Sequence, residues 1–323
     1  MDAQIPVQPE ISPSAPADIE GSASLEVTYD DVLTALVGGY GKKASEEDKK
    51  KFNQLLSNHL KQSAAKYTCE KNYNILVMYD NIVMVKSDSD RIYQAITALK
   101  DKEKSLLLIL LSNGGEPGAA YLIGQLCRES SNGRFVVVVP RYAKSAATLL
   151  ASAANEIHMG SLSELGPIDL QINGMPALAL KYSIEHIASL VSKMPKSAQM
   201  FARYLEYSVE PIQIGYYERA AESVAQYAER LLNSHKDTLS GNPADIAKKL
   251  VNEYKDHGFV IDKTEAKSIF GEGTVKTNTE EYKLGNEIYG ILSRVERIAG
   301  YLNYRFYFIG SFDSDPMLIE KDK

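Results

Sequence analysis

The stretch SLLLILLSNGGEPG, residues 105–118, decides the fold class of this chain of 323 residues. Residues 106–111 are apolar without interruption, which is typical of a strand covered on both faces of a sheet. The adjacent glycines Gly114 and Gly115 then allow the backbone to turn sharply into a helix that we expect to run to about Glu129. A buried strand, a glycine turn and a helix in this order indicate one unit of an α/β fold.

The same alternation continues on both sides of this stretch. We expect further strands at 74–79, 81–86, 135–139 and 156–159, and helices at 89–100 and 143–154. This order predicts a largely parallel sheet with right-handed crossovers. We expect the later part of the chain to be mostly helical, with helices at 177–192, 198–209 and 216–234 and a small strand at 304–309.

Composition and charge exclude several classes of protein. The apolar fraction of 44% supports a sizeable core, and the formal net charge of −6 argues against a nucleic-acid or membrane-surface binder, which is usually basic. The longest strongly apolar run, 106–111, is far shorter than the roughly 20 residues of a membrane-spanning helix.

Two cysteines, Cys69 and Cys127, rule out a disulfide framework and suit a reducing compartment. Because the amino terminus has neither a basic start nor an apolar stretch, we expect a cytoplasmic protein.

A serine follows the apolar strand FVVVV at 135–139. Ser145 stands where the next helix begins, among the small residues Ala143, Ala146 and Ala147. A hydroxyl in this position, followed by a free amide, has the geometry of an acyl-transfer nucleophile, and amides in the glycine turn can stabilise an oxyanion. Each motif also has a plain structural interpretation, as a helix N-cap and as a strand-to-helix turn.

A third motif, SLSELGPIDLQING, occupies residues 161–174 after the strand at 156–159. Polar residues in a stiff turn after a strand can line a cleft, contact another subunit or lie on the surface. We expect cleft-lining side chains from this turn and from the two motifs before it, namely Asn113, Lys144, Asp169 and Gln171.

In this order, the three motifs resemble the serine dehydrogenase proteinase family, a branch of the Clp-protease and crotonase superfamily close to signal peptide peptidase A. The resemblance runs from about Tyr73 to about Leu232, with a weaker echo at 257–273. It implies an α/β spiral of repeated β-β-α units with added helices at both ends, assembled into a homo-oligomer. It also implies a serine peptidase with Ser145 as nucleophile, and an oxyanion hole built from Gly114 or Gly115 and the Ala146 amide.

The resemblance does not identify the residue that acts as general base. Alanines replace the usual glycines after the serine, and no histidine stands in the loop after 156–159, where Clp proteases carry their base. Signal peptide peptidase relatives use a lysine a few dozen residues after the serine, which favours Lys196, 51 positions after Ser145, with Lys193 and Lys181 as alternatives. His257, in the family-like segment HGFVID, is the histidine that we would test.

The resemblance also divides the chain. We expect, in order, a disordered lead-in at 1–24, a helical extension at 25–72, the Clp-like core at 73–235, a helical region that completes the fold at 236–310 and a polar tail at 311–323.

The hypotheses for function fall into different classes. The first is a serine peptidase of the Ser-Lys type that acts on a peptide or protein, with no cofactor, metal, nucleic acid or membrane partner, since no metal-binding or phosphate-binding motif stands in the sequence. The second is a catalytically inert oligomeric scaffold or peptide-binding protein, which the alanines after Ser145 favour. The weakest is a crotonase-like acyl-CoA enzyme, because that fold also pairs two oxyanion amides.

Overall fold

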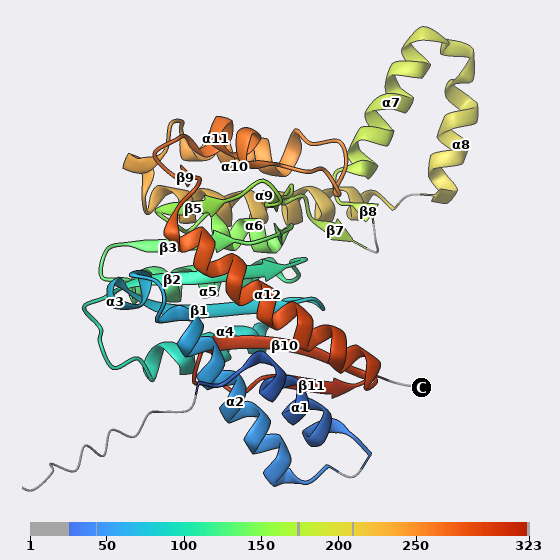
Figure 1. Ribbon diagram of the computed structural model, residues 1–323. Helices are drawn as coiled ribbons and strands as arrows, with labels where there is room; N and C mark the ends of the chain where they lie inside the picture. Colours follow the sequence, from blue (N-terminus) through green and yellow to red (C-terminus); the bar gives the residue numbers. More distant parts are fainter. Residues whose placement is uncertain (1–25, 43, 173–174, 209, 322–323) are drawn as a thin grey trace, which may run out of the picture.

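The structure is a computed structural model that describes residues 26–42, 44–172, 175–208 and 210–321. The lead-in expected at 1–24 lies outside these residues. The chain is a mixed α/β fold built on a central sheet, so the expected fold class is confirmed. Figure 1 shows helices on both faces of that sheet.

The elements before the sheet and through its centre follow in chain order. They are α1 (Tyr29–Tyr40), α2 (Glu46–Ala64), α3 (Cys69–Asn72), β1 (Tyr73–Asp80), α4 (Lys86–Thr97), β2 (Ser105–Ser112), α5 (Pro117–Glu129), β3 (Phe135–Val139), β4 (Tyr142–Ala143), α6 (Ala146–Ala151), β5 (Glu156–Met159), β6 (Glu164–Leu165), β7 (Gln171–Ile172) and β8 (Met175–Pro176).

The later elements are mostly helical, as the sequence predicts. They are α7 (Ala179–Lys193), the 3-10 turn η1 (Pro195–Ser197), α8 (Ala198–Ser208), α9 (Pro211–Asn233), η2 (Lys236–Thr238), α10 (Pro243–Asn252), α11 (Lys263–Phe270), β9 (Val275–Lys276), α12 (Glu280–Tyr301), β10 (Tyr304–Ser311) and β11 (Met317–Glu320).

The main sheet has the strand order β11-β10-β1-β2-β3-β5-β9 in the described part of the chain. The pairs from β1 through β9 are parallel, whereas β10 is antiparallel to β1 and β11 is antiparallel to β10. The short strands β4 and β6 form a parallel pair that joins the sheet where β2 ends, at Ser112 and Ala143. The carboxyl ends of the parallel strands therefore meet at one edge, where ligands gather in α/β proteins.

Strand β2 shows why the sheet is buried on both faces. Leu106, Leu108 and Leu110 pack into a core with α4, α5, α6 and α9, while Leu107 and Leu111 pack into a second core with α1, α2 and α12. Side chains alternate along a strand, so a strand that is apolar at every position can fill both cores.

Two segments differ from the expectation. The strand predicted at 81–86 is wrong: Asp80 accepts a hydrogen bond from the Ile82 amide at 2.9 Å and turns the chain out of the sheet, so that only Met84 makes a single bridge, to Gly115. Within the segment expected as a polar tail, residues 317–320 form β11, which pairs with β10.

Helices α7 and α8 form a hairpin that extends away from the body of the molecule, with η1 at its tip (Figure 1). Tyr204 and Tyr207 of α8 are exposed. The hairpin therefore presents apolar side chains that the body of the chain does not cover.

Candidate active site

The glycine turn after β2 lies directly against the Ser145 turn. Gly114 has a φ of 92°, and a Cβ placed there would lie 2.6 Å from the Lys144 carbonyl oxygen and 2.8 Å from the Ala146 nitrogen. Side chains rarely adopt this conformation and none fits this space, so the position requires glycine. Met84 holds the turn from the other side, since its amide donates to the Gly114 carbonyl and its carbonyl accepts from the Glu116 amide, both at 2.9 Å.

Ser145 adopts a backbone conformation that is strained for any residue other than glycine. Its φ is 50° and its ψ is −119°, and it stands directly before α6. Its side chain makes no capping hydrogen bond to a described residue, so the N-cap interpretation does not account for it. A strained serine at a strand-to-helix turn is the arrangement that exposes a nucleophile at the edge of an α/β sheet.

Two backbone amides beside Ser145 have no acceptor among the described residues. The Gly114 amide donates to Ser112 Oγ at 3.0 Å, whereas the Gly115 and Ala146 amides donate to no other group in the described part of the chain. Of the two glycines that the sequence left open, Gly115 is therefore the one with a free N–H. Free amides beside a nucleophile can hold the oxyanion of a tetrahedral intermediate.

The turns enclose a cleft of about 270 Å³. It brings together most of the site residues expected from the sequence, namely Asn113, Gly114, Gly115, Ser145, Ala146, Asp169, Gln171 and His257. Seven apolar side chains that the sequence did not single out also line it, namely Ile82, Val83, Pro117, Leu149, Ile168, Leu170 and Val224. Val224 comes from α9, and its only sequence signal was the helical spacing of that segment.

His257 and Asp169 form a hydrogen-bonded pair in this cleft. His257 Nδ1 lies 2.7 Å from Asp169 Oδ1, and Gln171 Nε2 donates to Asp169 Oδ2 at 2.7 Å. The bond to Asp169 raises the pKa of His257, against the lowering effect of partial burial. With its Nδ1 proton directed to a carboxylate, an imidazole has Nε2 available to accept a proton.

Lys144 does not line the cleft among the described residues, contrary to the expectation. Its ammonium lies 3.2 Å from both Glu164 Oε2 and the Leu165 carbonyl oxygen, on the side of β6. The positive charge of Lys144 also acts to lower the pKa of His257.

The three candidate lysine bases lie on the α7–α8 hairpin and not at the cleft. Lys196 is exposed on η1 and Lys193 is exposed at the end of α7. Lys181 forms an ion pair with Glu218 at 2.8 Å, and the hydrogen bond to Glu218 raises its pKa. None of the three is among the described residues that line the cleft. Lys196 lies away from the cleft of its own chain because the helical pattern around it builds a projecting hairpin.

Two further features of the described residues bear on the class of site. They contain no group of three or more His, Cys, Asp or Glu side chains placed to hold a metal ion. They also contain no helix that is long and apolar enough to cross a membrane.

Residues 72–200 match the family described as ClpP-like SDH-type serine proteinase. The resemblance expected from the three motifs is thereby confirmed over this segment, which contains the glycine turn, Ser145 and Asp169. The match ends before His257, which lies outside the SDH-type segment.

Relatives and solved structures give weaker similarities. Two uncharacterized proteins of Methanocaldococcus jannaschii are similar to part of the chain: one is 37% identical over 98 residues, 30% of this chain and 34% of the relative, and the other is 34% identical over 93 residues, 29% and 31%. The chain thus matches about a third of the length of these relatives.

A mutant of the 1510-N membrane-bound stomatin-specific protease is 15% identical, with a TM-score of 0.40, covering 68% of this chain and 85% of that one. A second mutant of that protease, in complex with a substrate peptide, is 16% identical, with a TM-score of 0.39, covering 65% and 76%.

Proposed function

We propose that this chain is a serine peptidase whose nucleophile is Ser145 and whose base is His257, oriented by Asp169. The observation that carries the proposal is that a strained serine with an uncapped hydroxyl and a hydrogen-bonded His–Asp pair line the same cleft. A nucleophile, a base and an orienting carboxylate are the three roles that acyl transfer by serine requires.

The chemistry follows from these roles. Ser145 Oγ attacks the carbonyl carbon of the scissile peptide bond and its proton passes to His257 Nε2. The Gly115 and Ala146 amides donate to the oxyanion of the tetrahedral intermediate. The C–N bond then breaks, and His257 gives the proton to the leaving amine. Water, deprotonated by the same imidazole, releases the acid and restores the serine.

Asp169 serves the imidazole in two ways. It fixes the tautomer that leaves Nε2 free, and it stabilises the imidazolium that forms when Ser145 loses its proton. Gln171, bonded to the other carboxylate oxygen, holds Asp169 in position.

The test is labelling by a fluorophosphonate probe, together with hydrolysis of casein, for the wild type and for Ser145→Ala. We expect labelling and hydrolysis of the wild type and loss of both in Ser145→Ala. Equal labelling of the two proteins would exclude Ser145 as the nucleophile. A wild type that neither labels nor hydrolyses would favour the inert scaffold instead.

We also propose that the α7–α8 hairpin joins copies of this chain into a homo-oligomer. The exposed Tyr204 and Tyr207 support this, because large apolar side chains on a projecting element mark a contact surface. Light scattering on the wild type and on the Tyr204→Ser/Tyr207→Ser variant tests it. A smaller assembly in the variant is expected, and an unchanged mass would contradict the proposal.

A further inference from the structure

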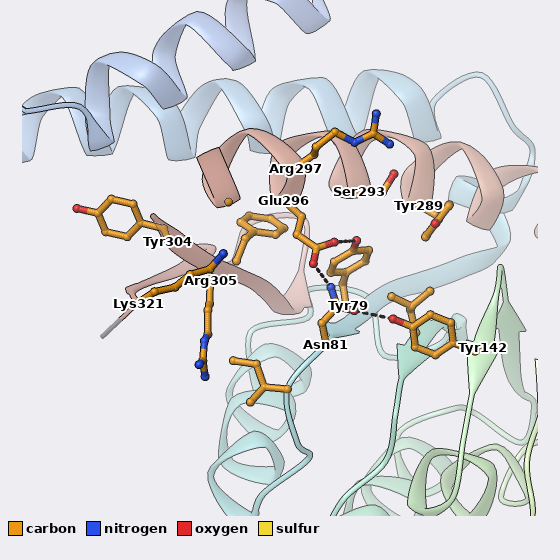
Figure 2. A pocket seen from close by; sticks show the side chains of 14 residues that line it. Tyr79, Asn81, Tyr142, Tyr289, Ser293, Glu296, Arg297, Tyr304, Arg305 and Lys321 are labelled. Atoms are coloured by element: carbon orange, nitrogen blue, oxygen red, sulfur yellow. Dashed lines mark hydrogen bonds between the residues drawn. The ribbon is translucent and has the colours of Figure 1, made fainter. Parts of the chain in front are cut away.

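A second cavity lies beside the Ser145 cleft and encloses about 790 Å³. Figure 2 shows its walls, which come from α12, from the start of β10, from the end of β1 and from Tyr142 of β4. Ile82, in the loop that follows β1, lines both the cavity and the cleft. The two spaces are therefore neighbours across this loop.

One wall of the cavity is a fixed chain of hydrogen bonds. Glu296 accepts from the Tyr79 hydroxyl and from the Asn81 amide, and the Tyr142 hydroxyl donates to Asn81 Oδ1 at 2.8 Å (Figure 2). Burial raises the pKa of Tyr142 to about 12, so its hydroxyl stays protonated as a donor. This wall is pre-formed, and both oxygens of its carboxylate are already satisfied by neutral donors.

The cavity carries an excess of positive charge. Arg297, Arg305 and Lys321 line it, and none of them forms an ion pair with another described residue. Glu296 is the one acidic side chain among the described lining residues. Such a surface attracts a ligand with several negative charges.

The aromatic walls and the volume point to a chain and not to a small ion. Tyr289, Tyr304 and Phe306 line the cavity, and the Arg141 guanidinium packs on the Tyr289 ring, 4.3 Å from its centroid. An inorganic anion would occupy a small part of 790 Å³ and would leave these aromatic faces without a contact. A peptide fills such a groove with backbone and side chains together.

We propose that this cavity binds an acidic segment of a polypeptide, with its carboxylates on Arg305, Lys321 and Arg297. Because Ile82 is shared, a polypeptide bound there can continue into the Ser145 cleft. The continuation into the Ser145 cleft rests on the proposed peptidase function, whereas binding of the acidic segment in the cavity does not.

The test measures binding by fluorescence anisotropy on the Ser145→Ala protein, so that no cleavage intervenes. The probe is a fluorescein-labelled decapeptide of alternating Glu and Gly, and the comparison peptide carries Lys in place of Glu. Arg305→Glu and Lys321→Glu reverse the charge of two cavity side chains. Lys248→Glu, on the exposed face of α10, makes the same change of charge away from the cavity and serves as the control.

We expect the Glu peptide to bind and the Lys peptide not to bind. Each cavity variant should weaken binding about tenfold or more, with less than about a twofold effect in the control. Equal binding of both peptides, or an equal effect of the control variant, would overturn the proposal. Displacement of the peptide by an equal concentration of free glutamate would also overturn it, since the site would then hold only a single anion. Failure of the wild type to hydrolyse any peptide would refute the peptidase and leave the binding result standing.

Discussion

His257 Nδ1 lies 2.7 Å from Asp169 Oδ1, although 88 positions separate the two residues in the chain. His257 comes from the loop between α10 and α11, and Asp169 from the turn after β6. The contact joins the part of the chain beyond the SDH-type segment to the motif that contains Asp169. It brings to the Ser145 cleft an imidazole that no local motif predicts.

The first prediction separates this base from a lysine. His257→Gln should lower kcat/KM by about 10³-fold or more, because the serine then loses its proton acceptor. Asp169→Asn should lower it by a smaller but large factor, since the imidazole loses its orienting partner. Lys196→Ala, on the exposed tip of the hairpin, should change kcat/KM less than about twofold. A peptide-hydrolysis assay on the three variants distinguishes a histidine base from a lysine base. A large loss of kcat/KM confined to Lys196→Ala would assign the base to the lysine.

The second prediction concerns pH. Asp169 raises the pKa of His257 above its ordinary value of 6.5, and a general base works only when it is neutral. Activity of the wild type should therefore rise with pH through a midpoint above 6.5. In Asp169→Asn the midpoint should move to lower pH, even though the maximum rate falls. Profiles of kcat/KM against pH for both proteins measure this, and superimposable acid limbs would show that His257 is not the base.

The same pKa shift has a consequence for stability, with a definite sign. The folded state favours protonated His257, so the contact adds stability that is fully present below pH 6.5 and is lost as pH rises through the folded pKa. The difference in free energy of unfolding between wild type and His257→Gln should therefore shrink toward alkaline pH. Urea titrations at acid and alkaline pH test this, and a difference that grows with pH would contradict it.

The sequence predicts the strands and turns of the site better than the contacts between them. The run at 106–111 and the glycines after it are local signals, so β2 and its turn could be predicted from residues a few positions apart. His257 and Asp169 could each be singled out, but the distance between them depends on how α10 and α11 pack behind the turn. Lys196 shows the converse, because helical spacing around it is equally consistent with a helix on the core and with the projecting hairpin.

The third prediction uses the strain at Ser145. With a φ of 50°, a residue with a Cβ is held in an unfavourable backbone region, whereas glycine is not. Ser145→Gly should therefore be more stable to unfolding than Ser145→Ala, by about 1 kcal/mol. Ser234, an exposed residue with a φ of −66°, is the matched control, and there the alanine variant should be the more stable. If the alanine variant were the more stable at position 145 as well, Ser145 would be unstrained.

The fourth prediction separates backbone strain from close packing at the glycine turn. Gly114 and Gly133 both have positive φ, 92° and 84°, so alanine is strained at either position. At Gly133 nothing lies within 4 Å of the added Cβ, whereas at Gly114 it would meet the Lys144 carbonyl oxygen at 2.6 Å. Gly114→Ala should therefore cost about 1–3 kcal/mol more unfolding free energy than Gly133→Ala, as overpacking does elsewhere. It should also reduce probe labelling of Ser145, because the clash pushes the two turns apart, while Gly133→Ala should label normally. Equal destabilisation with normal labelling in both variants would mean that the glycine turn and the serine turn do not meet as closely as the structure places them.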